Sequence, residues 1–158
     1  MTKNNDKTSE KELIVKAIKD GTVIDRIPSS ALFKVIAILD LENCENQITF
    51  GMNLESKKLG RKAIVKVADR FFTIDEVNRI ALIAPDAKLS VIRNYNVADK
   101  CTVRVPDTVE NILRCINPRC VTNHEHIATK FKKVTDSPLV MQCRYCEKHI
   151  DQEHFEIQ

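Results

Sequence analysis

Residues 47–67 decide the fold of the N-terminal part of this chain, and they read QITFGMNLESKKLGRKAIVKV. Apolar and polar residues alternate through residues 47–54, as expected for a β-strand with one buried face. The same alternation returns at residues 62–67, after a polar stretch at 55–60 that predicts a loop. Two consecutive strands are therefore expected here, and the other elements can be placed outward from them.

A helix is predicted on each side of these strands. Before them, apolar residues recur at helical spacing through residues 31–39, and the serines at 29–30 are candidate N-caps. After them, Thr73 and Glu76 have the spacing of a capping box, which predicts a second helix that continues through residues 77–83.

One further strand is expected beyond each helix. Alternation on both sides of Asp20 and Gly21 predicts a hairpin or a bent strand pair, and residues 89–97 predict a last strand. The resulting βαββαβ order is that of a ferredoxin-like α+β sandwich with both helices on one face of the sheet. We assign it residues 13–105, and we expect the polar residues 1–12 to form a flexible tail.

Length and composition fit a globular protein of one or two domains. The chain has 158 residues, 43% apolar and 30% charged, with a net charge of +3. No apolar run is long enough for a membrane span, and the polar N-terminus lacks the pattern of a secretory signal, so a cytoplasmic protein is expected. In a reducing compartment, the six cysteines indicate metal binding more than disulfides.

The C-terminal segment, residues 106–158, differs from the rest. It holds all four histidines and four of the six cysteines, with seven Lys or Arg against eight Asp or Glu. Such a short segment buries too little apolar surface to fold without a cross-link such as a disulfide bond or a metal ion. Two close thiol pairs, separated by 22 residues, can supply a tetrahedral site for one structural zinc ion with no open position for water. The pairs are Cys115 with Cys120 and Cys143 with Cys146. We therefore predict a small four-cysteine, zinc-ribbon-like β domain.

Other groups could in principle bind the metal or act as nucleophiles. His124, His126, His149 and His154 lie in or beside polar segments, and four cysteines already complete the shell. The two remaining cysteines, Cys44 and Cys101, have no adjacent histidine that would activate them. All six residues are therefore interpreted as non-ligands without a catalytic role.

The N-terminal domain shows bases but no catalytic motif. Lys62 and Lys66 are four residues apart on a predicted strand, so they share a face and could bind a polyphosphate; a solvated sheet surface explains them equally well. An RNA-recognition module would place aromatic residues on its central strands, and residues 62–67 contain none.

Several separated motifs resemble the regulatory chain of aspartate carbamoyltransferase. They are GTVIDRIP (21–28), ITFGMNL (48–54), GRK (60–62), NYNV (94–97) and QCRYCEK (142–148), and the similarity runs from Leu13 to the C-terminus. The resemblance implies a non-catalytic subunit with an allosteric domain that binds CTP as inhibitor or ATP as activator, with UTP as a further candidate.

The resemblance also implies partners. The zinc domain would dock on the catalytic chain, which makes carbamoyl aspartate in pyrimidine biosynthesis. Regulatory chains would pair as homodimers, and three such dimers would bridge two catalytic trimers into a dodecamer of six catalytic and six regulatory chains. Neither a nucleic acid nor a membrane is an expected partner.

The family's effector site can be carried over by position. Its nucleotide-binding positions fall on Val15, Ile18, Asp25, Lys66, Ile92, Tyr95, Val97 and Lys100, with Lys62 near the phosphates of a second, metal-linked nucleotide. Two positions depart from the best-known members: Arg26 replaces a histidine, and Ser90 replaces an asparagine. Arg26 keeps positive charge near the phosphates, whereas Ser90 lacks the amide that would help to separate cytosine from adenine.

The alternative interpretation is a zinc-ribbon protein that binds nucleic acid, since cysteine knuckles and a basic N-terminal part also permit that function. Such a protein would need a basic face on its zinc segment. Residues 107–158 are formally acidic before any metal is counted, and four thiolates with one Zn²⁺ would add further negative charge.

Overall fold

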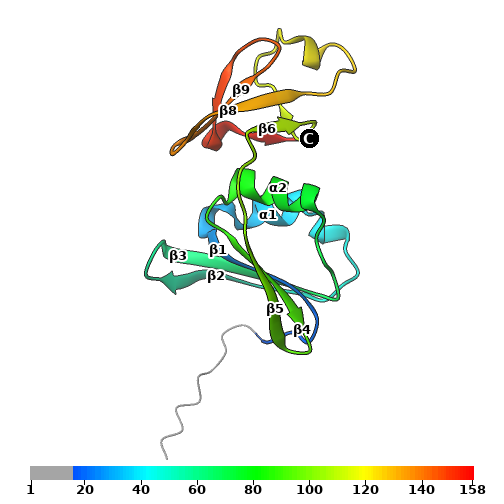
Figure 1. The fold of residues 1–158 in the computed structure, drawn as a ribbon, viewed down its shortest axis with the longest axis vertical. Helices are drawn as coiled ribbons and strands as arrows, with labels where there is room; N and C mark the ends of the chain where they lie inside the picture. Colours follow the sequence, from blue (N-terminus) through cyan, green and yellow to red (C-terminus); the bar gives the residue numbers. More distant parts are fainter. Residues whose placement is uncertain (1–15) are drawn as a thin grey trace, which may run out of the picture.

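The structure, a computed structural model, describes residues 16–158. The predicted tail (1–12) and the candidate effector residue Val15 lie outside this range. The chain forms two units stacked along its long axis (Figure 1). The N-terminal unit is a five-stranded sheet with two helices, and the C-terminal unit is built of short strands around the four cysteines.

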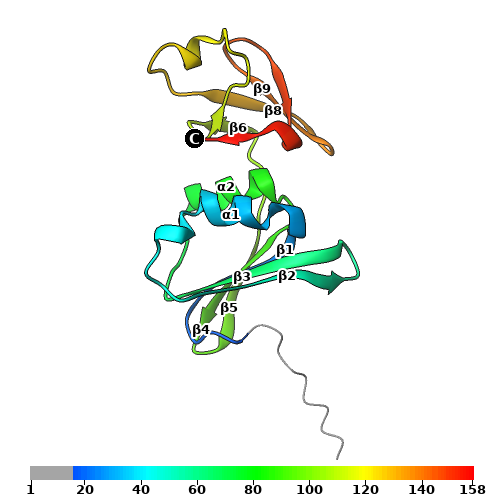
Figure 2. The same ribbon diagram turned by 180° about the vertical axis from the view of Figure 1, so that it is seen from behind.

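The sheet of the N-terminal unit has the order β2-β3-β1-β4-β5 with antiparallel neighbours. Both helices cover one face, and the other face is open (Figures 1 and 2). The elements are β1 (Gly21–Pro28), α1 (Leu32–Ile38), β2 (Ile48–Ser56), β3 (Gly60–Ala68), α2 (Ile74–Ile83), β4 (Lys88–Arg93) and β5 (Asn96–Thr102). The predicted ferredoxin-like α+β fold is confirmed, with β5 added beside β4.

The core of this unit lies between the sheet and the helices. Ile24 and Val65 project from the central strands toward the helices, and Leu32, Val35 and Ile80 pack on them from α1 and α2, all fully buried. Alternate residues of β3 are buried, as the sequence pattern predicted. The capping box of α2 is also confirmed: Thr73 Oγ1 accepts a hydrogen bond from the Glu76 amide, and the Glu76 carboxylate accepts one from the Thr73 amide at 2.8 Å.

Two predictions about where helices and strands begin were wrong. The serines at 29–30 do not cap α1; they form a 3-10 turn, η1 (Ser29–Ala31), with no side-chain cap. The strand pair around Asp20 and Gly21 is also absent from the described residues, because β1 begins at Gly21 and residues 16–20 form no strand. Gly21 is needed for another reason: a Cβ atom there would lie 2.1 Å from the Val67 carbonyl oxygen of β3.

The last predicted strand, residues 89–97, is in fact the end of one strand and the start of another. β4 ends at Arg93, Asn94 and Tyr95 turn with positive φ angles of 50° and 65°, and β5 runs back along β4. The continuous alternation hid this turn because its two residues are not glycine. Asn94 is one of the few residue types that tolerate this backbone region well.

The C-terminal unit consists of a four-stranded sheet in the order β10-β9-β8-β6 and a two-stranded sheet of β11 and β7. Phe131, Met141 and Ile150 fill its core. The elements are β6 (Thr108–Glu110), β7 (Leu113–Arg114), η3 (Val121–Asn123), β8 (Lys130–Asp136), β9 (Leu139–Cys143), β10 (His149–Asp151), η4 (Gln152–His154) and β11 (Glu156–Ile157).

The C-terminal unit rests on the helix layer of the N-terminal unit (Figures 1 and 2). Leu82 of α2 is fully buried among the apolar residues of the C-terminal core. Gln152 Nε2 donates a hydrogen bond of 2.9 Å to the carbonyl oxygen of Ile83, at the end of the same helix. In residues 16–158, no helix is long and apolar enough to span a membrane.

Candidate metal centre and effector face

The first cysteine pair lies in a loop that is stabilised by hydrogen bonds between the loop's own residues. The loop follows β7 and ends in η3, and the Cys120 amide donates to the Asn117 carbonyl oxygen at 3.0 Å. Asn123 Nδ2 reaches back to the carbonyl oxygens of Cys115 (2.9 Å) and Asn117 (2.8 Å). The wide four-residue gap is therefore a braced turn that presents both sulfur atoms on one side.

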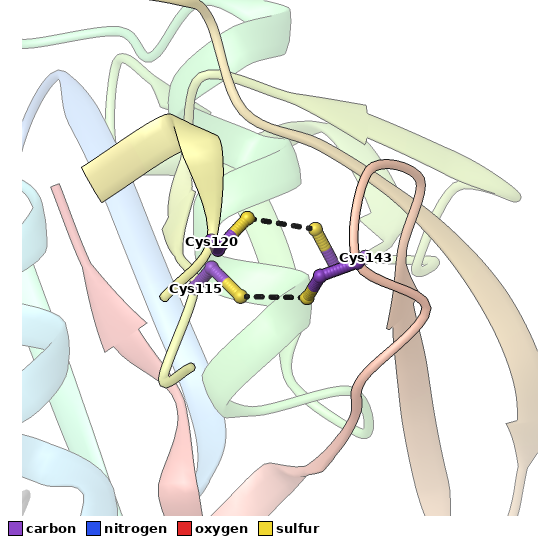
Figure 3. Close-up of side chains that lie close together, drawn as sticks. Cys115, Cys120 and Cys143 are labelled. Carbon is purple, nitrogen blue, oxygen red and sulfur yellow. Dashed lines mark hydrogen bonds between the residues drawn. The ribbon is translucent and has the colours of Figure 1, made fainter. Parts of the chain in front are cut away.

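The second pair lies on a tight turn after β9. The Cys143 amide donates to the Lys148 carbonyl oxygen, and the Glu147 amide donates to the Cys143 carbonyl oxygen, both at 3.0 Å. Glu147 completes this turn with a φ of 62°. The two turns face each other, so that sulfur atoms far apart in the sequence meet (Figure 3).

The four sulfur atoms form one compact cluster, all within 4.8 Å of one another. Cys115 Sγ lies 3.5 Å from Cys146 Sγ, and Cys120 Sγ lies 3.8 Å from Cys143 Sγ (Figure 3). Cys115, Cys120 and Cys143 are buried, and Cys146 is partly exposed. Four thiols gathered at these distances fit a tetrahedral metal site, and a thiolate set selects soft or borderline metals.

The thiols differ in how readily they ionise. Burial raises the pKa of Cys115 and of Cys143. Burial also disfavours the Cys146 thiolate, but interactions with the Asn117 side chain and the Lys148 amide outweigh it and lower the pKa of Cys146 to about 7. Without a cation, these buried thiols would resist becoming thiolates together, so a bound divalent metal ion would supply the missing positive charge.

The histidines stand outside this cluster among the described residues. His124 Nε2 lies 2.7 Å from the Pro118 carbonyl oxygen, and His154 Nδ1 lies 2.6 Å from an Asp151 carboxylate oxygen. His126 and His149 are exposed. The four-cysteine set needs no further ligand.

The open face of the five-stranded sheet brings together much of the second candidate site. Register places five residues in one row across all five strands: Thr49, Lys66, Val23, Ser90 and Lys100, each directly opposite the next. Directly opposed residues share a face of the sheet. Two lysines from different strands thus lie on the face away from the helices.

The charged residues of this face are partly paired. Lys62 Nζ lies 2.8 Å from Asp25 Oδ1, and Lys66 Nζ donates to the Lys16 carbonyl oxygen at 3.1 Å. Burial lowers the pKa of Lys66, and the nearby Asp25 carboxylate opposes that change. Arg26 occupies a bulge of β1 with a φ of 58°.

A cavity of about 270 Å³ opens beside this row, where residues 16–20 pass the β4–β5 turn. Ile18 and Tyr95 line it, together with Thr49. The Tyr95 amide donates to the Lys19 carbonyl oxygen at 2.8 Å, which fixes the segment against the turn.

The other candidates lie around the edge of this arrangement. Ile92 is buried, whereas Tyr95 and Val97 are 65% and 51% exposed. Sequence reasoning missed Val23 and Thr49, which complete the row of five, because only strand register shows that they are neighbours of Lys66.

Comparison with known proteins matches each of the two units to a profile of one family. Residues 13–104 match the family profile of the allosteric domain of the aspartate carbamoyltransferase regulatory chain, and residues 107–156 match that of its metal-binding domain. A regulatory chain from Bacteroides fragilis is 48% identical over 149 residues, which cover 94% of this chain and 97% of the relative. One from Pyrococcus abyssi is 52% identical over 144 residues, 90% of this chain and 95% of the relative.

Proposed function

This chain belongs to the family of aspartate carbamoyltransferase regulatory chains, and from that membership we propose that it senses CTP and ATP and conveys their binding to a catalytic chain. It is a regulatory subunit and not itself the catalyst. The observation that carries the choice of ligand is the row across the open face, which sets Lys66 and Lys100 on one surface beside a cavity.

The chemistry of the open face suits a nucleoside triphosphate. Lys66 and Lys100 offer ammonium groups to phosphate and ribose oxygens, and charge-assisted hydrogen bonds of this kind are among the stronger ones. Ile18 and Val97 offer apolar surface to the base, and the backbone near Ile92 and Tyr95 can read its edge. Lys62, already paired with Asp25, would serve a second, metal-linked nucleotide, and Arg26 would add positive charge.

Nucleotide binding is tested by titration calorimetry of the metal-loaded chain with CTP, followed by ATP in the presence of CTP. We expect saturable, mutually exclusive binding. Lys100→Ala should weaken it by about ten- to a hundredfold, because one charge-assisted contact is lost. Lys34→Ala is the matched control, since Lys34 is an exposed lysine on α1, on the other side of the sheet. If the unsubstituted, Lys100→Ala and Lys34→Ala chains all bound the nucleotides with equal affinity, the proposed site would be wrong.

The metal is proposed to be one structural Zn²⁺ per chain. A tetrahedron with Zn–S bonds of about 2.3 Å has edges of about 3.8 Å, close to the observed sulfur separations of 3.5 and 3.8 Å. Cys115, Cys120, Cys143 and Cys146 would then fill all four positions and leave none for a reacting water. The ion would hold the C-terminal unit in the shape that docks on the catalytic chain.

A regulatory homodimer is proposed to form at the β2 edge of the sheet. Unpaired strand edges invite pairing. This edge is apolar: Phe50, Met52 and Phe33 are 49%, 39% and 61% exposed. The two phenylalanine rings pack edge to face, with 6.4 Å between their centroids. The opposite edge, β5, exposes mainly polar and charged residues. Three such dimers could bridge two catalytic trimers.

Phe50→Asp is therefore expected to convert the dimer to monomer at micromolar concentration, because it places a charge in the apolar contact. Sedimentation equilibrium measures the change, which should exceed tenfold in dissociation constant. Ile74→Asp is the control, since Ile74 is an exposed apolar residue (80%) on another element, at the start of α2. A Phe50→Asp chain that remains dimeric would place the interface elsewhere.

A further inference from the structure

The connection between the two units, residues 103–107, is packed against both of them. Val103 is 2% exposed and belongs to the N-terminal core. Val105 packs against the hydrophobic clusters of both units. Between these two valines, Arg104 is exposed. A small change at Val105 would therefore alter the contact between the units.

Lys133 of β8 makes three interactions with this connection and a fourth with Asp136 of its own strand. Its Nζ atom donates to the Val105 carbonyl oxygen at 3.2 Å and lies 2.8 Å from Asp136 and 3.3 Å from Asp107. Its backbone amide donates to the Asp107 carbonyl oxygen at 2.7 Å. The Lys133 side chain is only 17% exposed, whereas the two carboxylates are 90% and 78% exposed. The lysine thus lies underneath its acidic partners, against the connection.

Strand geometry explains why a lysine points there. Lys133 follows the buried Phe131 by two residues, so both share the inward side of β8. The pairing of β8 with β9 shifts between Lys133 and Thr135, and Val134 is left unpaired. A bulge of this kind bends a strand and redirects its side chains. The hydrogen bond with Asp136 raises the pKa of Lys133 and keeps its ammonium group charged.

We propose that Lys133 is a latch that fixes the connection, and thereby sets how strongly a change in the N-terminal unit moves the C-terminal unit. The role in effector response rests on the proposed function; the latch itself does not. Away from the connection, the units share the buried Leu82 side chain and the Gln152–Ile83 hydrogen bond, and a cavity of about 270 Å³ lies between α1, the end of α2 and η4. That space leaves room for relative movement once the latch is lost.

The latch is tested by trypsin cleavage after Arg104, whose scissile bond ends at Val105. Metal-loaded full chain is digested briefly, and the fragment ending at Arg104 is quantified by mass spectrometry. Lys133→Met should raise its rate of appearance about tenfold, because the charged hydrogen bond to the Val105 carbonyl group and the ion pair with Asp107 no longer hold the connection. Asp136→Asn, which retains the lysine, should raise it two- to threefold.

Lys130→Met is the matched control on the same strand. Lys130 also has an acidic partner, Glu110 at 3.5 Å, but this pair lies within the β6–β8 sheet and does not touch residues 103–107. The Lys130→Met chain should be cleaved after Arg104 at the same rate as the unsubstituted chain. The latch would be refuted if the Lys133→Met chain were cleaved after Arg104 at the rate of the unsubstituted chain, or if Lys130→Met raised that rate as much as Lys133→Met. This conclusion does not depend on whether nucleotides bind.

A second measurement separates transmission from binding in the complex with the catalytic chain. For Lys133→Met, we expect unchanged nucleotide affinity by calorimetry but at least a twofold smaller change in catalytic activity at saturating nucleotide. An unchanged response alongside faster cleavage would refute the role in transmission. Absence of any response in the unsubstituted complex would refute the proposed function instead, and the cleavage rates would still decide the latch.

Discussion

A chain with Cys143 replaced by serine is expected to lose its metal ion and, with it, the fold of residues 107–158. Cys143 is fully buried at the centre of the C-terminal core, and its sulfur atom lies 3.8 Å from that of Cys120. Binding of structural zinc to small thiolate sites contributes on the order of 10 kcal/mol. The unit is too small to replace that contribution by burial.

The loss should be confined to one unit. Metal content falls from one ion per chain to none, and amide exchange in β8, β9 and β10 should become fast, while β1 and β3 stay protected. Because the C-terminal unit is proposed to dock on the catalytic chain, gel filtration with that chain should show no complex. A Cys143→Ser protein that binds one metal ion per chain and assembles normally would refute the assignment.

Cys101→Ser is the matched control for this substitution. Cys101 is an exposed thiol on β5 and takes no part in the four-sulfur cluster. It should leave metal content, amide exchange and assembly unchanged. Any common effect of the two substitutions would point to thiol chemistry in general and not to metal ligation.

The second large effect is expected for Gly21→Ala, which adds one methyl group at the start of the central strand β1. Gly21 has a φ of 137°, and an added Cβ would lie 2.1 Å from the Val67 carbonyl oxygen and 3.0 Å from the Asp69 amide nitrogen. Both neighbours are backbone atoms, so β1 and β3 would have to separate. We expect a loss of about 3 kcal/mol or more in the free energy of unfolding.

Gly60→Ala supplies the comparison, since Gly60 also has a positive φ, of 76°, but nothing lies within 4 Å of its Cβ position. Only the backbone preference is lost there, at a cost of about 1 kcal/mol. Urea unfolding of the N-terminal unit measures both. Equal destabilisation by the two substitutions would show that contact with β3 is not what requires glycine at position 21.

Sequence reasoning succeeded where a single physical rule controls the outcome. The alternation in residues 62–67 correctly predicted the buried face of β3, and the Thr73–Glu76 spacing correctly predicted the start of α2. The spacing of the cysteines predicted one cluster, since thiols in two short turns can meet at one metal ion. Each of these signals is local, or depends on metal binding through thiolate groups, which only cysteine side chains supply.

It failed where the reason for a residue lies in a distant segment. Gly21 was interpreted as a turn residue because the carbonyl oxygen that excludes a side chain belongs to Val67. The row from Thr49 to Lys100 depends on the register of four strand pairs, which alternation alone does not give. No pattern marked Lys133, because the backbone carbonyl group that it holds carries no signature in the sequence.

The helix layer lies between the two surfaces proposed to meet other molecules. The open face of the sheet points one way, and the C-terminal unit stands on α1 and α2 on the other side (Figures 1 and 2). A nucleotide on the open face lies on the side of the sheet away from the C-terminal unit (Figures 1 and 2), so its influence must pass through the sheet and then through the helices or the connection at residues 103–107. In the proposed function, a substitution on the open face, such as one at Ser90, would therefore change the preference for a base without altering the surface proposed to dock on the catalytic chain.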